Sequence, residues 1–166
     1  GFYLLIMLNP ESAVGSVWVE LTGDSLTFSF SGLVIASIIY SLPFMVQPLQ
    51  AAFRAVPEPV LEAAATLGAS PRDRWLNVVL PMAKRGYLTG CVLTFAHTVG
   101  EFGVVLMMGG NIPGETRVLS IAIYEHVETL NYDAAHLLAL GLLCFSFLSL
   151  WLVYRYAGHR FEVVRG

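Results

Sequence analysis

Charged residues are scarce in this 166-residue chain. Asp, Glu, Lys and Arg make up 13% of the residues and apolar residues make up 56%, whereas a typical soluble domain has about 25% charged residues. A chain this short has too little polar sequence to cover several all-apolar helices in water. The composition therefore argues against a soluble domain and predicts an all-α, polytopic membrane helical bundle in a single domain.

Cysteine is also rare, and Cys91 and Cys144 lack the spacing of a disulfide framework or a metal site. The histidines are scattered without ligand spacing: His97, His126, His136 and His159. The chain has neither the Gly-x-x-x-x-Gly-Lys-Ser/Thr loop that cradles nucleotide phosphates nor a nucleophile elbow. These absences predict that the chain is not an enzyme and binds no metal or cofactor of its own.

Three apolar stretches are long enough to cross a bilayer, which takes about 20 mainly apolar residues. They are residues 32–53, 87–108 and 134–156. A shorter run at residues 2–8 lacks the basic residues of a signal peptide. We interpret it as the end of another helix whose start lies outside this sequence, which gives an N-terminally truncated domain. Pro43 and Pro48 predict a kink in the first span.

The basic residues predict the orientation of these spans. Eight of the nine follow the first span or lie at or beyond the end of the third: Arg54, Arg72, Arg74, Lys84, Arg85, Arg155, Arg160 and Arg165. Loops rich in Lys and Arg stay in the cytoplasm. The loop 54–85 and the C-terminus are therefore predicted to be cytoplasmic, and the segments 9–31 and 109–133 are predicted to be external.

The predicted cytoplasmic loop contains signals for two short helices. The first is expected over residues 60–67, ended by Gly68 in the left-handed conformation. Ser70-Pro71-Arg72-Asp73 has the form of a capping box and predicts a second helix over residues 71–80, which Pro81 ends or kinks. Together they predict a compact projection, although a plain amphipathic connection on the lipid surface fits the spacing as well.

The spacing in this loop resembles the signature loop of bacterial ABC importer permeases. That pattern has Glu-Ala-Ala, then a Gly four positions after the last Ala, then an aliphatic residue and Leu-Pro. Every element is present: Glu62, Ala63, Ala64, Gly68, Val78, Leu80 and Pro81. The resemblance implies that this coupling loop docks on an ATPase subunit, and that ATP is bound by that partner. The small alanines permit close approach, and Gly68 permits the sharp turn.

The second span contains two titratable residues, His97 and Glu101, on one helical face. An ionised group near the bilayer centre costs about 2.5–3.5 kcal/mol, so this face is predicted to point into the bundle. Gly100 and Gly103 flank the glutamate and allow close helix packing. Two interpretations stay open: a position in a transport pathway or its gate, or a buried contact that locks the bundle.

The segment after this span indicates which branch of these permeases the chain resembles. Its Pro-Gly pair predicts a turn, and Glu125 and Glu128 favour a surface helix over a fourth span. Gly100-Glu101-Phe102-Gly103 with Asn111-Ile112-Pro113-Gly114-Glu115-Thr116-Arg117 resembles the molybdate branch of these permeases. Sulfate and thiosulfate permeases share the first motif and Asn-Ile-Pro, and commonly differ after the proline. The candidate pathway or gate residues are His97, Gly100, Glu101, Phe102, Gly103, Asn111, Gly114, Glu115, Thr116 and Arg117.

The resemblance implies a permease subunit in a bacterial or archaeal cytoplasmic membrane. Two copies would form the pathway, an extracytoplasmic binding protein would deliver molybdate or tungstate, and two ATPase subunits would grip the coupling loops. A sulfate or thiosulfate permease is the alternative substrate class, and no nucleic acid partner is implied. An ion-coupled secondary transporter is the alternative of a different kind. It would use His97 and Glu101 as a proton relay and would need no docking loop.

Overall fold

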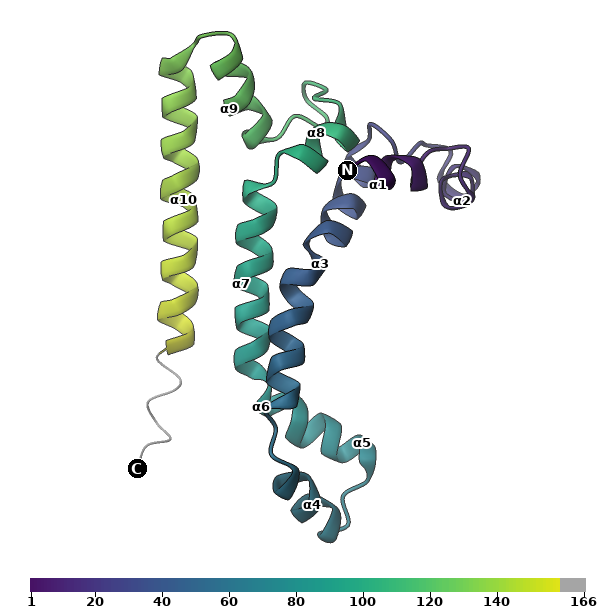
Figure 1. The fold of residues 1–166 in the computed structure, drawn as a ribbon, viewed down its shortest axis with the longest axis vertical. Helices are drawn as coiled ribbons and strands as arrows, with labels where there is room; N and C mark the ends of the chain where they lie inside the picture. Colours follow the sequence, from purple (N-terminus) through teal and green to yellow (C-terminus); the bar gives the residue numbers. More distant parts are fainter. Residues whose placement is uncertain (159–166) are drawn as a thin grey trace.

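The computed structural model describes residues 1–158, and the regular structure in that part of the chain is helical throughout (Figure 1). The elements are α1 (Phe2–Met7), α2 (Ala13–Thr22), α3 (Phe30–Arg54), α4 (Glu58–Thr66), α5 (Pro71–Arg74), η1 (Trp75–Val79), α6 (Leu80–Met82), α7 (Lys84–Gly100), α8 (Gly103–Gly109), α9 (Leu119–Glu128) and α10 (Tyr132–Gly158). The predicted all-α class is confirmed. Arg160 and Arg165, which entered the prediction of a cytoplasmic C-terminus, and His159 lie outside the described residues.

Two helices are long and apolar enough to cross a membrane by themselves: α3, and α10 over Tyr132–Leu152. Both fall on stretches predicted as spans. The structure divides the remaining predicted span, residues 87–108, into α7 and α8, which meet at a bend of 62°. The apolar count did not reveal this break, because hydropathy is insensitive to the direction of the backbone.

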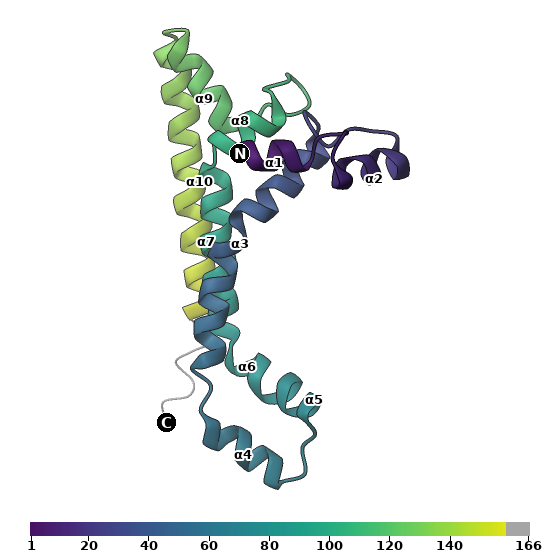
Figure 2. The ribbon, with the colours of Figure 1, turned by 45° about the vertical axis from the view of Figure 1, so that its right-hand side comes forward.

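The helices form a long frame with a cluster of short elements at each end (Figures 1 and 2). α3 and α7 lie side by side along the long axis, and α10 runs along the same axis and contacts α9 and α7. α1, α2, α8 and α9 gather at one end, and α4, α5, η1 and α6 gather at the other. The loop 54–85 therefore lies at one end of the frame, and the segments 9–31 and 109–133 lie at the other.

The buried apolar side chains belong mostly to the end that holds α1 and α8. They form two small clusters: Leu8, Leu26, Ala36, Val104 and Met108, and then Leu33, Val105 and Ile121. α10 differs, because only 6% of its apolar window is buried. An apolar helix with so little covered surface is suited to lipid or to further helices, not to water.

α3 and α7 approach each other at backbone distance through two glycines. A Cβ atom on Gly86 would lie 2.3 Å from the Cβ of Ala52 and 2.9 Å from the carbonyl oxygen of Pro48. A Cβ atom on Gly90 would lie 2.6 Å from the sulfur of Met45. Gly86 and Gly90 are four residues apart, which is the small-residue spacing that lets membrane helices pack closely. This Gly-x-x-x-Gly pair was visible in the sequence but formed no part of the prediction.

Candidate functional site

The first half of the candidate coupling loop is a short exposed helix, α4. It begins at Glu58, two residues before the expected start, with Pro59 in its first turn, and none of its residues is buried. Glu62 and Ala63 are exposed, while Ala64 is half-buried. α4 packs against α5 at the tip of the frame (Figure 1). The Glu-Ala-Ala segment is therefore accessible to a partner.

Gly68 ends this helical segment in the way that the sequence predicted. Its φ is +85°, in the left-handed region that side chains with a Cβ rarely adopt. The following residue, Ala69, donates its N–H to the carbonyl oxygen of Ala64 at 3.0 Å. A Cβ atom on Gly68 would meet no atom within 4 Å. Glycine is needed here for the backbone conformation alone, not for lack of space.

The second half of the loop begins with the predicted capping box. Ser70 Oγ accepts the Asp73 N–H at 3.2 Å, and the Asp73 carboxylate accepts the Ser70 N–H at 3.2 Å. The helix that follows does not end at residue 80. It passes through the π-helical turn η1 and continues through Pro81 to Met82.

The π-helical turn has a local cause in Pro81. Proline has no N–H to donate and its ring crowds the preceding turn, so a regular α-helix cannot pass through it unchanged. The N–H of Leu80 instead reaches the carbonyl oxygen of Trp75, five residues back. Val78 and Leu80 are half-buried at the base of the loop and Pro81 is exposed, whereas the neighbouring Val79 is buried. The second part of the motif thus lies next to α3 and α7, away from the exposed tip.

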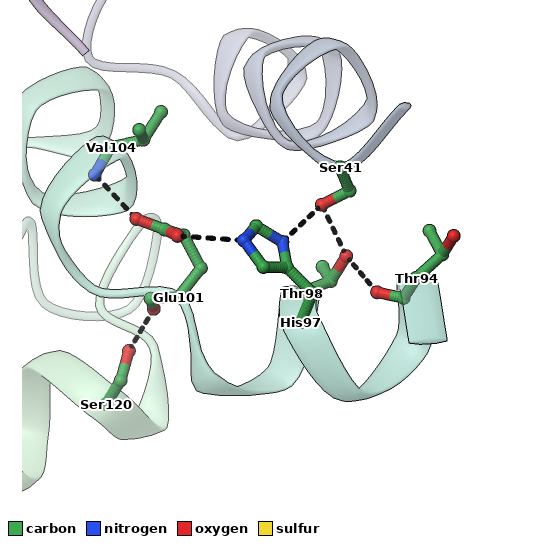
Figure 3. A network of polar contacts seen from close by, with 7 residues as sticks. All are labelled: Ser41, Thr94, His97, Thr98, Glu101, Val104 and Ser120. Carbon is green, nitrogen blue, oxygen red and sulfur yellow. Dashed lines mark hydrogen bonds and ion pairs between the residues drawn. The ribbon is translucent and has the colours of Figure 1, made fainter. Parts of the chain in front are cut away.

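A polar network surrounds the break between α7 and α8 (Figure 3). Glu101 stands at the break with φ −68° and ψ 133°, outside the helical region. Its Oε1 accepts the N–H of Val104 at 2.9 Å and so satisfies one of the free donors at the start of α8. Its own carbonyl oxygen accepts the hydroxyl of Ser120, from α9, at 2.7 Å. One residue therefore joins α7, α8 and α9.

His97 extends this network from α7 to α3. Its Nε2 lies 3.8 Å from Glu101 Oε2, and its Nδ1 lies 3.1 Å from the hydroxyl of Ser41. The imidazole stacks on Phe44 with 4.0 Å between ring centroids. The side chains of His97 and Glu101 are 19% and 12% exposed. The two side chains lie close together, although Glu101 is outside the helix on which the sequence had placed both residues. Through Ser41, the network extends to α3.

Ser41 holds the centre of the α3 side of this network. It is 2% exposed, and its hydroxyl lies 2.9 Å from that of Thr98. The Thr98 hydroxyl in turn donates to the carbonyl oxygen of Thr94 at 2.8 Å. The sequence interpretation missed Ser41, Thr98 and Ser120. The serines in the uncharged first span, Ser37 and Ser41, were the available signal, because a hydroxyl in a membrane helix needs a partner.

The segment 109–117 closes on itself near α9. The Thr116 side chain is 1% exposed; it donates to the carbonyl oxygen of Gly109 and accepts the N–H of Ile112. The Arg117 guanidinium lies 3.1 Å from the Glu125 carboxylate and donates to Asn111 Oδ1 at 3.0 Å. Arg117 is therefore already paired and is not a free cation waiting for an anion.

The candidate pathway residues fall into two separate groups. His97, Gly100, Glu101, Phe102 and Gly103 surround the α7–α8 break, whereas Asn111, Gly114, Glu115, Thr116 and Arg117 form the closed loop beyond α8. Gly114 has a φ of +80°, and both it and Glu115 are exposed. The groups are linked through α9, because Ser120 bonds to the first and Glu125 to the second. From the sequence, Glu125 served only to favour a surface helix over a fourth span, and its pairing with Arg117 was not predicted.

Replacing Thr116 by valine is expected to loosen the loop beyond α8. The substitution keeps the shape of the side chain but leaves the Gly109 carbonyl and the Ile112 N–H without their partner. A buried polar group without a partner costs about 1–3 kcal/mol. The melting temperature of the purified protein in detergent should fall. Thr129→Val, at an exposed position, should change it much less; equal shifts in the two variants would contradict this role of Thr116.

Comparison with known proteins gives one family and several relatives. Residues 1–160 match the sequence profile of the family described as "Binding-protein-dependent transport system inner membrane component". The chain is 53% identical over 154 residues to the "Molybdenum transport system permease protein ModB" of Azotobacter vinelandii, covering 93% of this chain and 68% of that protein. It is 34% identical over 129 residues to the protein of the same name from Escherichia coli K12, covering 78% of this chain and 56% of that protein.

A relative with another printed name is less similar to this chain than the Azotobacter vinelandii protein is. A "Probable sulfate transport system permease protein cysT" from Zygnema circumcarinatum is 32% identical over 153 residues, covering 92% of this chain and 53% of that protein. The chain thus spans between 53% and 68% of the length of these three relatives.

Proposed function

The chain belongs to the binding-protein-dependent transport system inner membrane component family, and on that basis we propose that it is the permease subunit of an ABC importer for molybdate. The observation that carries the proposal is the 53% identity to a molybdenum transport permease over 93% of this chain. The chain supplies the membrane pathway, and a separate subunit supplies the ATP hydrolysis. Tungstate, an oxyanion of the same shape and charge, belongs to the same proposed substrate class.

The same comparisons bear on the substrate alternatives. Sulfate permeases are also relatives, but at 32% identity or less they are more distant than the 53% relative. Sulfate or thiosulfate therefore remains the second candidate substrate. Membership in a binding-protein-dependent family argues against an ion-coupled secondary transporter, so a proton relay through His97 and Glu101 is not proposed.

We propose that α3, the bent pair α7–α8 and α10 cross the membrane. The end of the frame with α4–α6 faces the cytoplasm, because five of the nine Lys and Arg residues lie within 54–85. The opposite end, with segments 9–31 and 109–133, then faces outward, where a binding protein delivers the oxyanion. The C-terminus after α10 shares the cytoplasmic side, as Arg155 suggests.

The coupling loop is the proposed contact with the ATPase. Its exposed tip, α4 with Glu62, Ala63, Ala64 and Gly68, has no buried residue, and small side chains there permit close docking. Val78, Leu80 and Pro81 connect this tip to the spanning helices. Two permease copies and two ATPase subunits form the transporter. ATP binding shifts the balance between outward-open and inward-open states by moving these loops.

The polar network at Glu101 is the proposed gate region. It joins four helices at a bend, and an adjoining cavity of about 290 Å³ is lined by Glu101 together with Ser37, Thr98 and Ser120 among apolar side chains. A carboxylate repels an anion, so Glu101 is proposed to hold the bend and not to bind the oxyanion. The closed loop 109–117 supports the outer side of this region through α9.

Uptake into vesicles tests the proposal. The complete transporter, with its ATPase subunits and binding protein, is reconstituted and supplied with labelled molybdate, tungstate or sulfate. We expect ATP-dependent accumulation of molybdate and tungstate and far less of sulfate. A preference for sulfate would move the chain to the sulfate class, and uptake independent of ATP would reject the importer assignment.

A further inference from the structure

Three aromatic side chains join the base of the coupling loop to the two spanning helices beside it. Phe53 lies in the last turn of α3, Trp75 is the first residue of η1, and Tyr87 lies in the first turn of α7. The ring centroids of Phe53 and Trp75 are 5.2 Å apart, and those of Phe53 and Tyr87 are 6.0 Å apart with nearly perpendicular planes. Both distances are in the favourable range for aromatic pairs. Phe53 therefore contacts a ring of the loop and a ring of α7 at once.

The rest of the structure explains why this contact is important. α4 has no buried residue and packs against α5, and contacts through α5, η1 and α6 connect it to α7. The buried side chains of this path are Val79, at the end of the π-helical turn, and Ala83, which follows it. Trp75 lies before them, at the point where the loop turns towards the membrane helices. Its ring gives the first half of the path a direct contact with α3.

We propose that Trp75 is a positioning residue for coupling, a role that rests on the proposed function as an ABC permease. It holds the loop against Phe53, so that a displacement of α4 moves α3 and α7 together as one unit. The close approach at Gly86 and Gly90 keeps that unit rigid above the contact. Without the Trp75 ring, the loop swings relative to α3, and part of the movement produced by ATP is lost.

The test compares Trp75→Ala with the wild type in the complete transporter. The ratio of labelled molybdate taken up to ATP hydrolysed should fall about threefold to tenfold, which matches the usual strength of an aromatic pair. The amount of ATPase subunit that co-purifies should stay at the wild-type level, because Trp75 lies outside α4. Trp75→Phe should restore most of the ratio, since a phenyl ring can still contact Phe53.

Leu76 provides a matched control, because it is the next residue and is equally exposed, at 47% for both side chains. It is not part of the aromatic contact, so Leu76→Ala should keep the wild-type ratio. Phe53→Ala should show at least the defect of Trp75→Ala, because it also loses the contact with Tyr87. The double variant Phe53→Ala/Trp75→Ala should be no worse than Phe53→Ala, because the shared contact is lost only once.

Three results would overturn the role of Trp75. The first is release of the ATPase subunit by Trp75→Ala, which would place Trp75 in the docking surface itself. The second is a Trp75→Ala variant with the wild-type ratio of molybdate taken up to ATP hydrolysed, while the wild-type transporter takes up molybdate normally. That result rejects the positioning role and leaves the permease function standing. The third is wild-type transporter without ATP-driven oxyanion uptake, which rejects the permease function and the role of Trp75 with it.

Discussion

Replacing Gly68 by valine should detach the ATPase subunit and lower ATP-driven uptake at least fivefold. Gly68 has a φ of +85°, and a β-branched residue in the left-handed region is strained by about 1–3 kcal/mol. The turn after α4 relaxes to relieve that strain and moves the Glu62–Ala64 segment away from the position that docking requires. Co-purification of the ATPase with the tagged permease, together with molybdate uptake, measures the result.

The chain contains a close structural control for this substitution. Gly23 ends α2 with a φ of +81°, and a Cβ atom there, as at Gly68, would meet nothing within 4 Å. Gly23→Val thus imposes similar strain at the opposite end of the molecule and should leave the ATPase bound. Gly68→Asn should be tolerated better than Gly68→Val, because asparagine enters the left-handed region more readily. An intact complex and normal uptake with Gly68→Val would show that the docking proposal is wrong.

Removing the carboxylate of Glu101 should produce the second large defect. Glu101→Ala leaves the Val104 N–H without its acceptor and His97 without its neighbour. Loss of a helix cap alone costs about 0.5–2 kcal/mol. We expect a lower melting temperature and uptake reduced about tenfold or more, since the bend between α7 and α8 is no longer held.

Glu101→Gln separates the two roles that the sequence left open for this residue. Its amide oxygen can still accept the Val104 N–H, so assembly and thermal stability should stay near the wild type. Uptake should nevertheless fall, because the contact with His97 loses its charge. Unchanged uptake with normal assembly would reject the gate and leave Glu101 as a cap only. Glu20→Gln, at an exposed position on α2, serves as the control for loss of a carboxylate.

The features that the sequence predicted well are those set by neighbouring residues. The capping box at Ser70 and Asp73 and the left-handed Gly68 depend on a few adjacent residues, and both are present in the structure. The helical character of the long apolar stretches follows from their length and composition, because a long apolar segment in a bilayer must satisfy its backbone groups within itself; in α3 the one charged residue, Arg54, lies in the last turn.

The features that escaped prediction depend on contacts between distant segments or on competing backbone geometries. Glu101 and Ser120 meet across 19 residues of chain, and Ser41 and His97 across 56. Counting apolar residues cannot show that Glu101 caps a second helix instead of continuing the first. Pro81 predicted that the helix would end or kink. Instead, a π-helical turn precedes the proline and the helix continues, an outcome that the local sequence did not predict.

The glycine contact between α3 and α7 has a consequence for how the protein is made. These helices are separated only by the 55–83 segment, and they meet at backbone distance through Gly86 and Gly90. A chain emerging from the ribosome can therefore form this hairpin before α10 has been synthesised. α10 buries little surface against the earlier helices, so the contact between α3 and α7 does not depend on it. The helix pair that flanks the coupling loop can therefore form before the helix that follows it.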